Sequence, residues 1–386
     1  MTILIAPDKF KGSLTAQQVC KAIEEGLLSI NPSLKIVSIP LADGGEGTSD
    51  LLTDFSRGST VCVTVADPLF RKIESAYGIS KDGRTAFIEM AKASGLQLLN
   101  SKERNPLNTT TFGTGQLIKH AMERGVNHII LGIGGSATND AGIGMAEALG
   151  YSFFSATKDK LKPVGKNLVH LATIDTDHIH PLLLPTKFTV LCDVQNQLSG
   201  KGGAAFVFGP QKGASGEDVK ILDRGLRQFK KIAEATFNKD VDFPGAGAAG
   251  GLGAGAKVFL DATLSRGFEF IANFTQLEAL IRKSDLVLTG EGKIDHQTLS
   301  GKVVKGVAGL AAQHQKPCIA FTGKCDLPVK KIQELNLLEI ISISNKETIE
   351  QDSITHAFSL LKERTITHLS DWIIQIDKSQ QPKAKS

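Results

Sequence analysis

The sequence predicts an α/β protein with two α/β domains, and three observations carry that prediction. The chain begins with a strand–helix–strand–helix alternation, its middle part holds short β-rich segments, and the alternation resumes from residue 285. Helical crossovers between strands indicate a parallel sheet, and 386 residues exceed the size of one ordinary core. We therefore expect a Rossmann-like parallel-sheet domain built from both chain ends, with a second α/β domain of mixed sheet inserted into it.

The two ends of the chain supply the first domain. Apolar segments at 2–6 and 35–41 are predicted strands, and the helix between them begins at Thr15, which can form a capping box with Gln18. The remaining expected elements are a helix through 51–52, strands at 286–289, 317–321 and 339–344, a helix at 303–313, and helical segments up to residue 376.

In the middle of the chain, after Gly58, the pattern of apolar residues changes from alternating strands and helices to short β-rich segments. Short β-rich segments separated by turn residues predict antiparallel strands at 60–66, 72–78 and 85–90. The expected elements beyond them are a helix at 114–124, strands at 128–131 and 187–192, a long helix at 217–237, and a helix ending near 283. We assign 1–64 and 284–378 to the Rossmann-like domain, 65–283 to the inserted domain, and 379–386 to a disordered tail.

Composition narrows the class of protein. A net charge of +4 from 44 basic and 40 acidic residues is too small to indicate nucleic-acid binding. The five cysteines form no zinc-binding spacing, and their odd, scattered distribution suits a reducing compartment. No segment has the length of a membrane span, and the N-terminal apolar run is too short for a signal peptide. We expect a cytoplasmic monomer or homodimer that binds neither nucleic acid nor membrane.

Apolar runs repeatedly end in polar or glycine-rich loops. Six such loops begin near Asp8, Asp43, Gly132, Asp193, Gly290 and Thr322. Ligands of open parallel sheets bind beyond the carboxyl ends of the strands. Together the six loops favour a ligand cleft between the two domains, completed by domain closure.

The segment 131–140 has the order strand, glycine turn and helix start. We expect its helix to run from Ala141 to Leu149, and the exposed N–H groups and helix dipole to favour an anion. Residues 132–137 also match the GxGxxA form of the dinucleotide fingerprint, but no acidic residue ends a second strand about twenty residues later. An NAD(P)-dependent dehydrogenase of a small hydroxy acid is thus an alternative, as is a non-catalytic protein that binds a small anion.

The loops carry the residue types that phosphoryl transfer needs. Glycine N–H groups and lysines such as Lys11, Lys212 and Lys293 can neutralise phosphate oxygens, and the carboxylates can hold Mg²⁺ or accept a hydroxyl proton. The Walker A pattern is absent from the sequence. Each carboxylate alone would more often be a helix cap or turn residue, so the argument rests on their joint position at strand ends.

Several segments resemble signature segments of the bacterial glycerate kinases of the type I family, in family order. They are residues 6–13, 41–48, 132–140, 208–214, 245–255 and 289–295. The resemblance implies two α/β domains and transfer of the γ-phosphoryl group of ATP to D-glycerate with Mg²⁺. It favours 2-phosphoglycerate as the product, in glycerate/glyoxylate or sugar-acid catabolism. Ala141 stands where this family commonly has glycine, which fits if that residue is already helical.

Roles for individual residues follow as hypotheses from that chemistry. The expected catalytic residues are Asp193, Asp295 and Lys11, with Asp193 or Asp295 preferred over Asp140 as the base. Substrate contacts are expected from Asp8, Lys9, Asp43, Ser136, Thr138, Asn139 and Asp140. Nucleotide contacts are expected from Gly134, Gly135, Gly290, Glu291, Gly292 and Lys293, and Mg²⁺ contacts from Asp193 and Glu291. Which glycine-rich loop faces ATP and which faces glycerate stays open.

Overall fold

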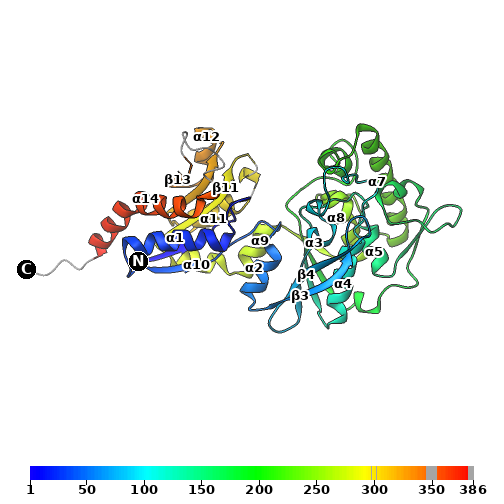
Figure 1. The fold of residues 1–386 in the computed structure, drawn as a ribbon, viewed down its shortest axis with the longest axis horizontal. Helices are drawn as coiled ribbons and strands as arrows, with labels where there is room; N and C mark the ends of the chain where they lie inside the picture. The colour runs from blue at the N-terminus through cyan, green and yellow to red at the C-terminus, as the bar shows by residue number, and fades with distance from the viewer. Residues whose placement is uncertain (297, 301, 345–353, 381–386) are drawn as a thin grey trace, which may run out of the picture. The chain divides into compact units, whose positions relative to one another are not determined.

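The computed structural model describes residues 1–296, 298–300, 302–344 and 354–380. The chain packs as two compact units (Figure 1): unit 1 comprises Met1–Asp43 and Phe268–Ser386, and unit 2 comprises Gly44–Gly267. The sequence places the boundaries near 64 and 284, whereas the packing places them after Asp43 and Gly267. Of the tail predicted at 379–386, residues 381–386 lie outside the described part of the chain.

The residues just after Asp43 belong to unit 2 because their helix is bound to its sheet. In helix α2 (Thr48–Phe55), the Ser49 N–H donates to Glu89 Oε1 at 2.7 Å and the Ser49 hydroxyl donates to the Phe87 carbonyl at 2.8 Å. Both acceptors lie in strand β5 (Thr85–Glu89). The helix therefore packs with the strands that follow it, not with the strand that precedes it.

Unit 1 is built on a five-stranded parallel sheet. Its strands are β1 (Thr2–Ile5), β2 (Lys35–Ser38), β11 (Leu286–Ile294), β12 (Cys318–Cys325) and β13 (Glu339–Ser342). The order across the sheet is β13-β12-β11-β1-β2, and every neighbouring pair is parallel. The expected parallel sheet from both chain ends is thus present. Strand β1 lies between a strand close to it in sequence and one from the far end of the chain.

Helices pack on this sheet. Helix α1 (Ala16–Ile30) has the expected capping box of Thr15 and Gln18, and it lies beside α14 (Ala357–Gln380), as Figure 1 shows in blue and red. A Cβ atom at Gly26 of α1 would lie 2.8 Å from Thr365 Cβ of α14, so glycine permits this close approach. The other α-helices in the described part of this region are α9 (Gly267–Phe274), α10 (Leu277–Lys283), α11 (Val303–Gln313) and the short α12 (Val329–Ile332).

Strands β11 and β12 continue through segments that the sequence predicted as loops. Their pairing extends past Gly290 opposite Phe321 to Ile294 opposite Cys325. The expectation of loops at 290–295 and 322–324 was therefore wrong for most of these residues. Each strand supplies the other's hydrogen-bond partners, so glycine and lysine are held in the sheet despite their weak strand preference.

Unit 2 has a mixed sheet, as the sequence predicted. Its strands are β3 (Ser59–Ala66), β4 (Lys72–Ile79), β5, β6 (His128–Gly132), β9 (Lys187–Leu191) and β10 (Thr263–Ser265), in the order β10-β9-β6-β5-β4-β3. The pairs β3–β4 and β4–β5 are antiparallel, and the remaining pairs are parallel. Strands β7 (Ser152–Phe154) and β8 (Thr173–Asp175) form a separate antiparallel pair.

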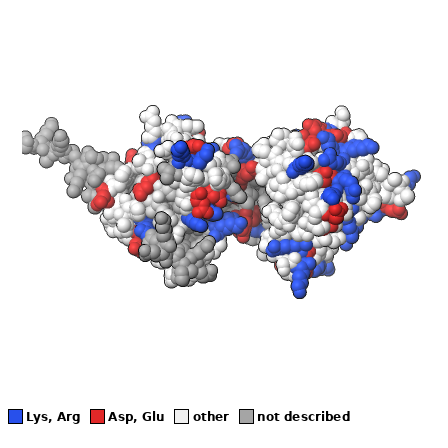
Figure 2. Space-filling view, turned by 90° about the horizontal axis from the view of Figure 1, so that it is seen from above, with Lys and Arg blue, Asp and Glu red and all other residues white. Residues whose placement is uncertain are grey.

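The helices of unit 2 surround this sheet and share its hydrophobic core. They are α2, α3 (Ala91–Ser94), α4 (Phe112–Glu123), α5 (Ile143–Ala148), α6 (Ala204–Phe208), α7 (Gly216–Phe237) and α8 (Ala248–Phe259). Within the described residues, no helix combines the length and apolar character needed to cross a bilayer. Figure 2 shows basic and acidic side chains interspersed on each unit in that view, without one continuous basic surface.

Candidate functional site

The sheet of unit 1 has a topological switch point between β1 and β11. The chain moves from β1 to β2 on one side, and from β11 through β12 to β13 on the other. Ligands of open parallel sheets bind at such points, beyond the carboxyl ends of the strands. Asp8 follows β1 and Glu291 lies in the carboxyl-terminal part of β11, so two predicted site residues lie at this point.

Asp8 is a buried carboxyl group, 7% exposed. Its N–H donates to the Gly290 carbonyl at 2.8 Å, which fixes the segment after β1 against β11. Its Oδ1 accepts the Lys9 N–H at 2.7 Å. Burial, followed by the charge of Asp43, raises the pKa of Asp8 to about 7, and Glu291 adds a smaller contribution in the same direction. The group therefore titrates in the range where a general base operates best.

Glu291 has a similar environment and is 8% exposed. Its Oε1 accepts a hydrogen bond from the Thr298 hydroxyl at 2.6 Å. Burial raises the pKa of Glu291 to about 7; Thr298 and Lys302 oppose the shift, whereas Asp295 and Asp43 add to it. Glu291 and Asp8 therefore share a locally acidic region in which a cation would be stabilised.

Two lysines beside these carboxyl groups form ion pairs. Lys302 Nζ lies 3.7 Å from Asp43 Oδ2. Lys293 Nζ lies 2.9 Å from Asp326 Oδ2 and 3.9 Å from Asp295 Oδ2. The predicted nucleotide ligand Lys293 is thus bound to carboxylates here. Lys302, which the sequence did not single out as a site residue, directly precedes α11 and supplies a positive charge near Asp43 and Glu291.

Close packing of the backbone explains why glycine occupies two of the predicted nucleotide-binding positions of unit 1. A Cβ atom at Gly290 would lie 2.5 Å from the Phe321 carbonyl oxygen, and one at Gly292 would lie 2.9 Å from the Lys11 backbone nitrogen. Both distances are far too short for a methyl carbon. Gly290 therefore lets β11 lie close to β12, and Gly292 lets the segment after β1 lie directly against β11, while the Lys11 side chain stays exposed.

In unit 2, Asp193 follows β9, and its side chain accepts a hydrogen bond from a backbone N–H group. Its Oδ1 accepts the Gly267 N–H at 2.8 Å, and Gly267 is the last residue of the unit. A Cβ atom at Gly44, the first residue of the unit, would lie 3.1 Å from Gly267 Cα and 3.8 Å from Asp193 Oδ2. Asp193 thus joins the two points where the chain enters and leaves unit 2.

The helix after the 131–140 segment begins later than the sequence predicted. Ala141 and Gly142 have φ of 52° and 77°, in the left-handed region, and α5 begins at Ile143. The expectation that Ala141 is already helical was therefore wrong, because two left-handed residues intervene. The Asp140 carboxylate accepts the Gly142 N–H at 3.1 Å and the Gly144 N–H at 3.3 Å. The N–H groups expected to bind an external anion are thus bound by Asp140.

Asp140 is fully buried and also accepts the Thr111 N–H at 2.7 Å and the Thr111 hydroxyl at 2.8 Å. Burial raises its pKa, and these four hydrogen bonds oppose the shift. The neighbouring Thr138 hydroxyl and Asn139 amide are buried and have no hydrogen-bond partner among the described residues. Gly134 and Gly135, in contrast, are exposed, so this loop presents its glycines to solvent and its polar side chains to the interior.

Lys212, which the sequence predicted would neutralise phosphate, is 2% exposed. Its Nζ donates to Ser136 Oγ and to the Thr138 carbonyl, each at 2.7 Å. Burial lowers the pKa of Lys212 to about 7, against the opposing effect of Asp140. The side chain therefore holds the 136–138 segment from inside the unit.

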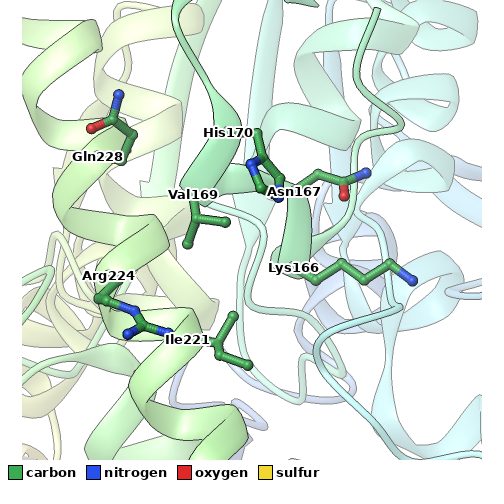
Figure 3. A pocket seen from close by; sticks show the side chains of 7 residues that line it. All are labelled: Lys166, Asn167, Val169, His170, Ile221, Arg224 and Gln228. Carbon is green, nitrogen blue, oxygen red and sulfur yellow. The ribbon is translucent and has the colours of Figure 1, made fainter. Parts of the chain in front are cut away.

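A surface pocket of about 600 Å³ lies between the turn at Gly165–His170 and helix α7. Figure 3 shows the side chains that line it, which are Lys166, Asn167, Val169, His170, Ile221, Arg224 and Gln228. No predicted site residue is among them. Among the described residues, no group of three or more His, Cys, Asp or Glu side chains is placed so that it could hold a metal ion by itself.

Fold and site together define a two-unit α/β enzyme with buried carboxyl groups at the switch point of a parallel sheet. Comparison with known proteins identifies the family: the model described as the glycerate kinase family matches residues 3–373. The chain is 44% identical to a glycerate kinase from Halalkalibacterium halodurans, over 96% of this chain and 98% of that protein. It is 44% identical to a glycerate 2-kinase from Escherichia coli, over 89% of this chain and 90% of that protein.

A solved structure agrees with these relatives. A crystal structure named for glycerate kinase 2 from Salmonella typhimurium LT2 matches with a TM-score of 0.86 and 41% identity, covering 99% of this chain and 100% of that chain. The chain belongs to the glycerate kinase family. The resemblance stated from the six sequence segments is thereby confirmed, as is the prediction of an enzyme.

Proposed function

We propose that this protein transfers the γ-phosphoryl group of ATP to a hydroxyl group of D-glycerate, with Mg²⁺, and that 2-phosphoglycerate is the favoured product. Family membership supports the reaction class. The observation that carries the proposal is the pair of buried carboxyl groups, Asp8 and Glu291, at the switch point of unit 1. Phosphoryl transfer needs positioned groups and charge stabilisation more than covalent chemistry.

We assign the role of general base to Asp8. Its Oδ1 is occupied by the Lys9 N–H, whereas its Oδ2 has no hydrogen-bond partner among the described residues. Of the two residues expected from the sequence as the base, Asp193 accepts the Gly267 N–H and Asp295 lies 3.9 Å from Lys293 Nζ. Asp8 would accept the proton of the attacking hydroxyl group, and Lys9 and Lys11 follow it in the chain as cations for an anionic ligand.

The residues of unit 1 fit Mg²⁺. This ion prefers carboxylate oxygens and keeps several waters, so one or two carboxylates and the substrate phosphates complete its shell. Glu291 and Asp43 would hold it; burial is the main cause of the raised pKa of Glu291, Asp295 and Asp43 add to it, and a bound cation would stabilise the ionised form. When bound, Mg²⁺ neutralises charge on the phosphate oxygens. Lys302, whose Nζ lies 3.7 Å from Asp43 Oδ2, would hold that carboxylate in place.

One assay tests the proposal. ADP formation is followed after ATP, Mg²⁺ and D-glycerate are added to the protein, and the product is examined by phosphorus NMR. Phosphate on the 2-hydroxyl couples to one proton, and phosphate on the 3-hydroxyl couples to two, so the spectrum separates the isomers. Absence of ADP formation with glycerate and related hydroxy acids would refute the proposal. A dehydrogenase would instead change nicotinamide absorbance, and a binding protein would show no turnover.

A further inference from the structure

Lys212 sets the direction in which the Ser136 hydroxyl donates its proton. The hydroxyl group has one hydrogen and two lone pairs. Since Lys212 Nζ donates to Ser136 Oγ at 2.7 Å, one lone pair is occupied and the hydroxyl hydrogen points elsewhere. Among the described residues no acceptor for that hydrogen is present. Ser136 is 8% exposed, so its donor lies at the edge of the interior, where a ligand oxygen could reach it.

The positive charge of Lys212 has no carboxylate in direct contact within the described part of unit 2. Asp140 is the group whose charge acts on it, but the Asp140 oxygens are bound by Thr111, Gly142 and Gly144. An ammonium group buried without an ion pair is costly unless its charge serves a ligand or a polar network. Lys212 donates to two neutral oxygens instead, and its charge makes the Ser136 hydroxyl a stronger donor toward an acceptor outside the loop.

We propose that Ser136 donates a hydrogen bond to an anionic oxygen of a substrate, either the carboxylate of the hydroxy acid or a phosphate of the nucleotide, and that Lys212 is the positioning residue that orients this donor. This inference rests on the proposed function, because it names a contact for one of its substrates. The exposed Gly134 and Gly135 precede Ser136 and leave room for such a ligand to approach the backbone.

Protonation of Lys212 matters to this arrangement. Only the ammonium form must donate to both Ser136 Oγ and the Thr138 carbonyl, whereas a neutral amine can instead accept the Ser136 hydrogen. Burial lowers the pKa of Lys212 to about 7, with Asp140 as the charged group that opposes the change. Substrate affinity should therefore weaken as the pH rises above about 7. The pKa values of Asp8 and Glu291 are also raised to about 7, so the part of this pH dependence that disappears in Ser136→Ala is the part that Lys212 imposes.

The test compares Ser136→Ala, Lys212→Met and the double variant, with Lys220→Met as a control that removes an exposed lysine of the same unit. Loss of a hydrogen bond to a charged oxygen should raise the KM of one substrate about 10- to 100-fold, with a smaller change in kcat. The substrate whose KM responds, glycerate or ATP, identifies the anionic oxygen. The double variant should be no worse than the worse single variant, because both remove one contact.

The outcomes separate this inference from the proposed function. If the wild type forms no ADP with glycerate, the proposed function fails. If the wild type is active but Ser136→Ala changes neither KM, or the two substitutions act additively, the inference about Ser136 and Lys212 fails alone. If Lys212→Met does not fold, the KM values of Ser136→Ala and their pH dependence compared with that of the wild type still decide. A wild-type KM that stays constant above pH of about 7 contradicts the role of Lys212.

Discussion

Replacing Asp8 with asparagine should stabilise the free protein while removing its proposed activity. Burial and the charge of Asp43 raise the pKa of Asp8 from 3.8 to about 7. A carboxyl group with a higher pKa in the folded state opposes folding once the pH exceeds its unfolded pKa, because the unfolded chain then binds fewer protons. Asparagine keeps the Oδ1 acceptor that meets the Lys9 N–H at 2.7 Å. The substitution therefore removes the charge and keeps this hydrogen bond, while the NH₂ group takes the place of Oδ2, which accepts no hydrogen bond from the described residues.

The size of the pKa shift of Asp8 determines how much Asp8→Asn should raise the free energy of unfolding. One pKa unit corresponds to about 1.4 kcal/mol, so the gain in unfolding free energy at a pH near 8 has a ceiling of about 4 kcal/mol. Part of the shift comes from the charges of Asp43 and Glu291, not from burial. We therefore expect a gain of about 1 to 3 kcal/mol. Each kcal/mol raises the melting temperature of a unit of this size by about 2 to 4 °C.

Calorimetry in a chelating buffer without substrates measures this effect. The gain of Asp8→Asn should be largest above a pH of about 7, shrink as the pH falls, and vanish well below a pH of about 4, where wild-type Asp8 keeps its proton in both states. Asp326→Asn is the matched control, since Lys293 lowers the pKa of that exposed carboxyl group, and it should give no gain. A lower melting temperature for Asp8→Asn at high pH, or a gain independent of pH, would refute the reasoning.

Two further substitutions test the packing of unit 1 and the choice of base. Gly292→Ala would place a methyl carbon 2.9 Å from the Lys11 nitrogen, so we expect a loss of about 1 to 3 kcal/mol in urea unfolding; an unchanged midpoint would contradict the close approach. Asp193→Asn keeps an acceptor for the Gly267 N–H, and kcat should stay within about tenfold, whereas loss of a base costs about 10²- to 10⁴-fold. A hundredfold loss would return the role of base from Asp8 to Asp193.

The sequence predicted the elements whose apolar pattern is regular and whose ends are marked. The strand at Thr2–Ile5 and the capping box of Thr15 and Gln18 are local features, and both are present. The mixed sheet of unit 2 followed from a change of period after Gly58. The joint position of Asp8 and Glu291 also followed, because both come after apolar runs of one parallel sheet.

Other features depend on contacts between distant segments, and the sequence did not reveal them. The strand character of 290–294 arises from pairing with β12, whose residues lie about thirty positions later in the chain. The burial of Lys212 depends on Ser136 and Thr138, more than seventy residues before it. A lysine in a glycine-rich loop is usually exposed, so only its place in the 208–214 segment could have suggested a special role.

Replacement by asparagine should stabilise the protein at Asp8 but destabilise it at Asp140, although both carboxyl groups are buried. All four hydrogen bonds to Asp140 come from N–H or O–H donors, namely the Thr111 N–H and hydroxyl and the N–H groups of Gly142 and Gly144. These donors favour the ionised form, and both oxygens are used. In Asp140→Asn the NH₂ group would face donors at one oxygen position, so we expect a loss of about 2 to 4 kcal/mol. Urea unfolding of both variants at one pH measures the contrast. A stabilised Asp140→Asn would show that the carboxyl group is protonated and that burial, not hydrogen bonding, determines its charge.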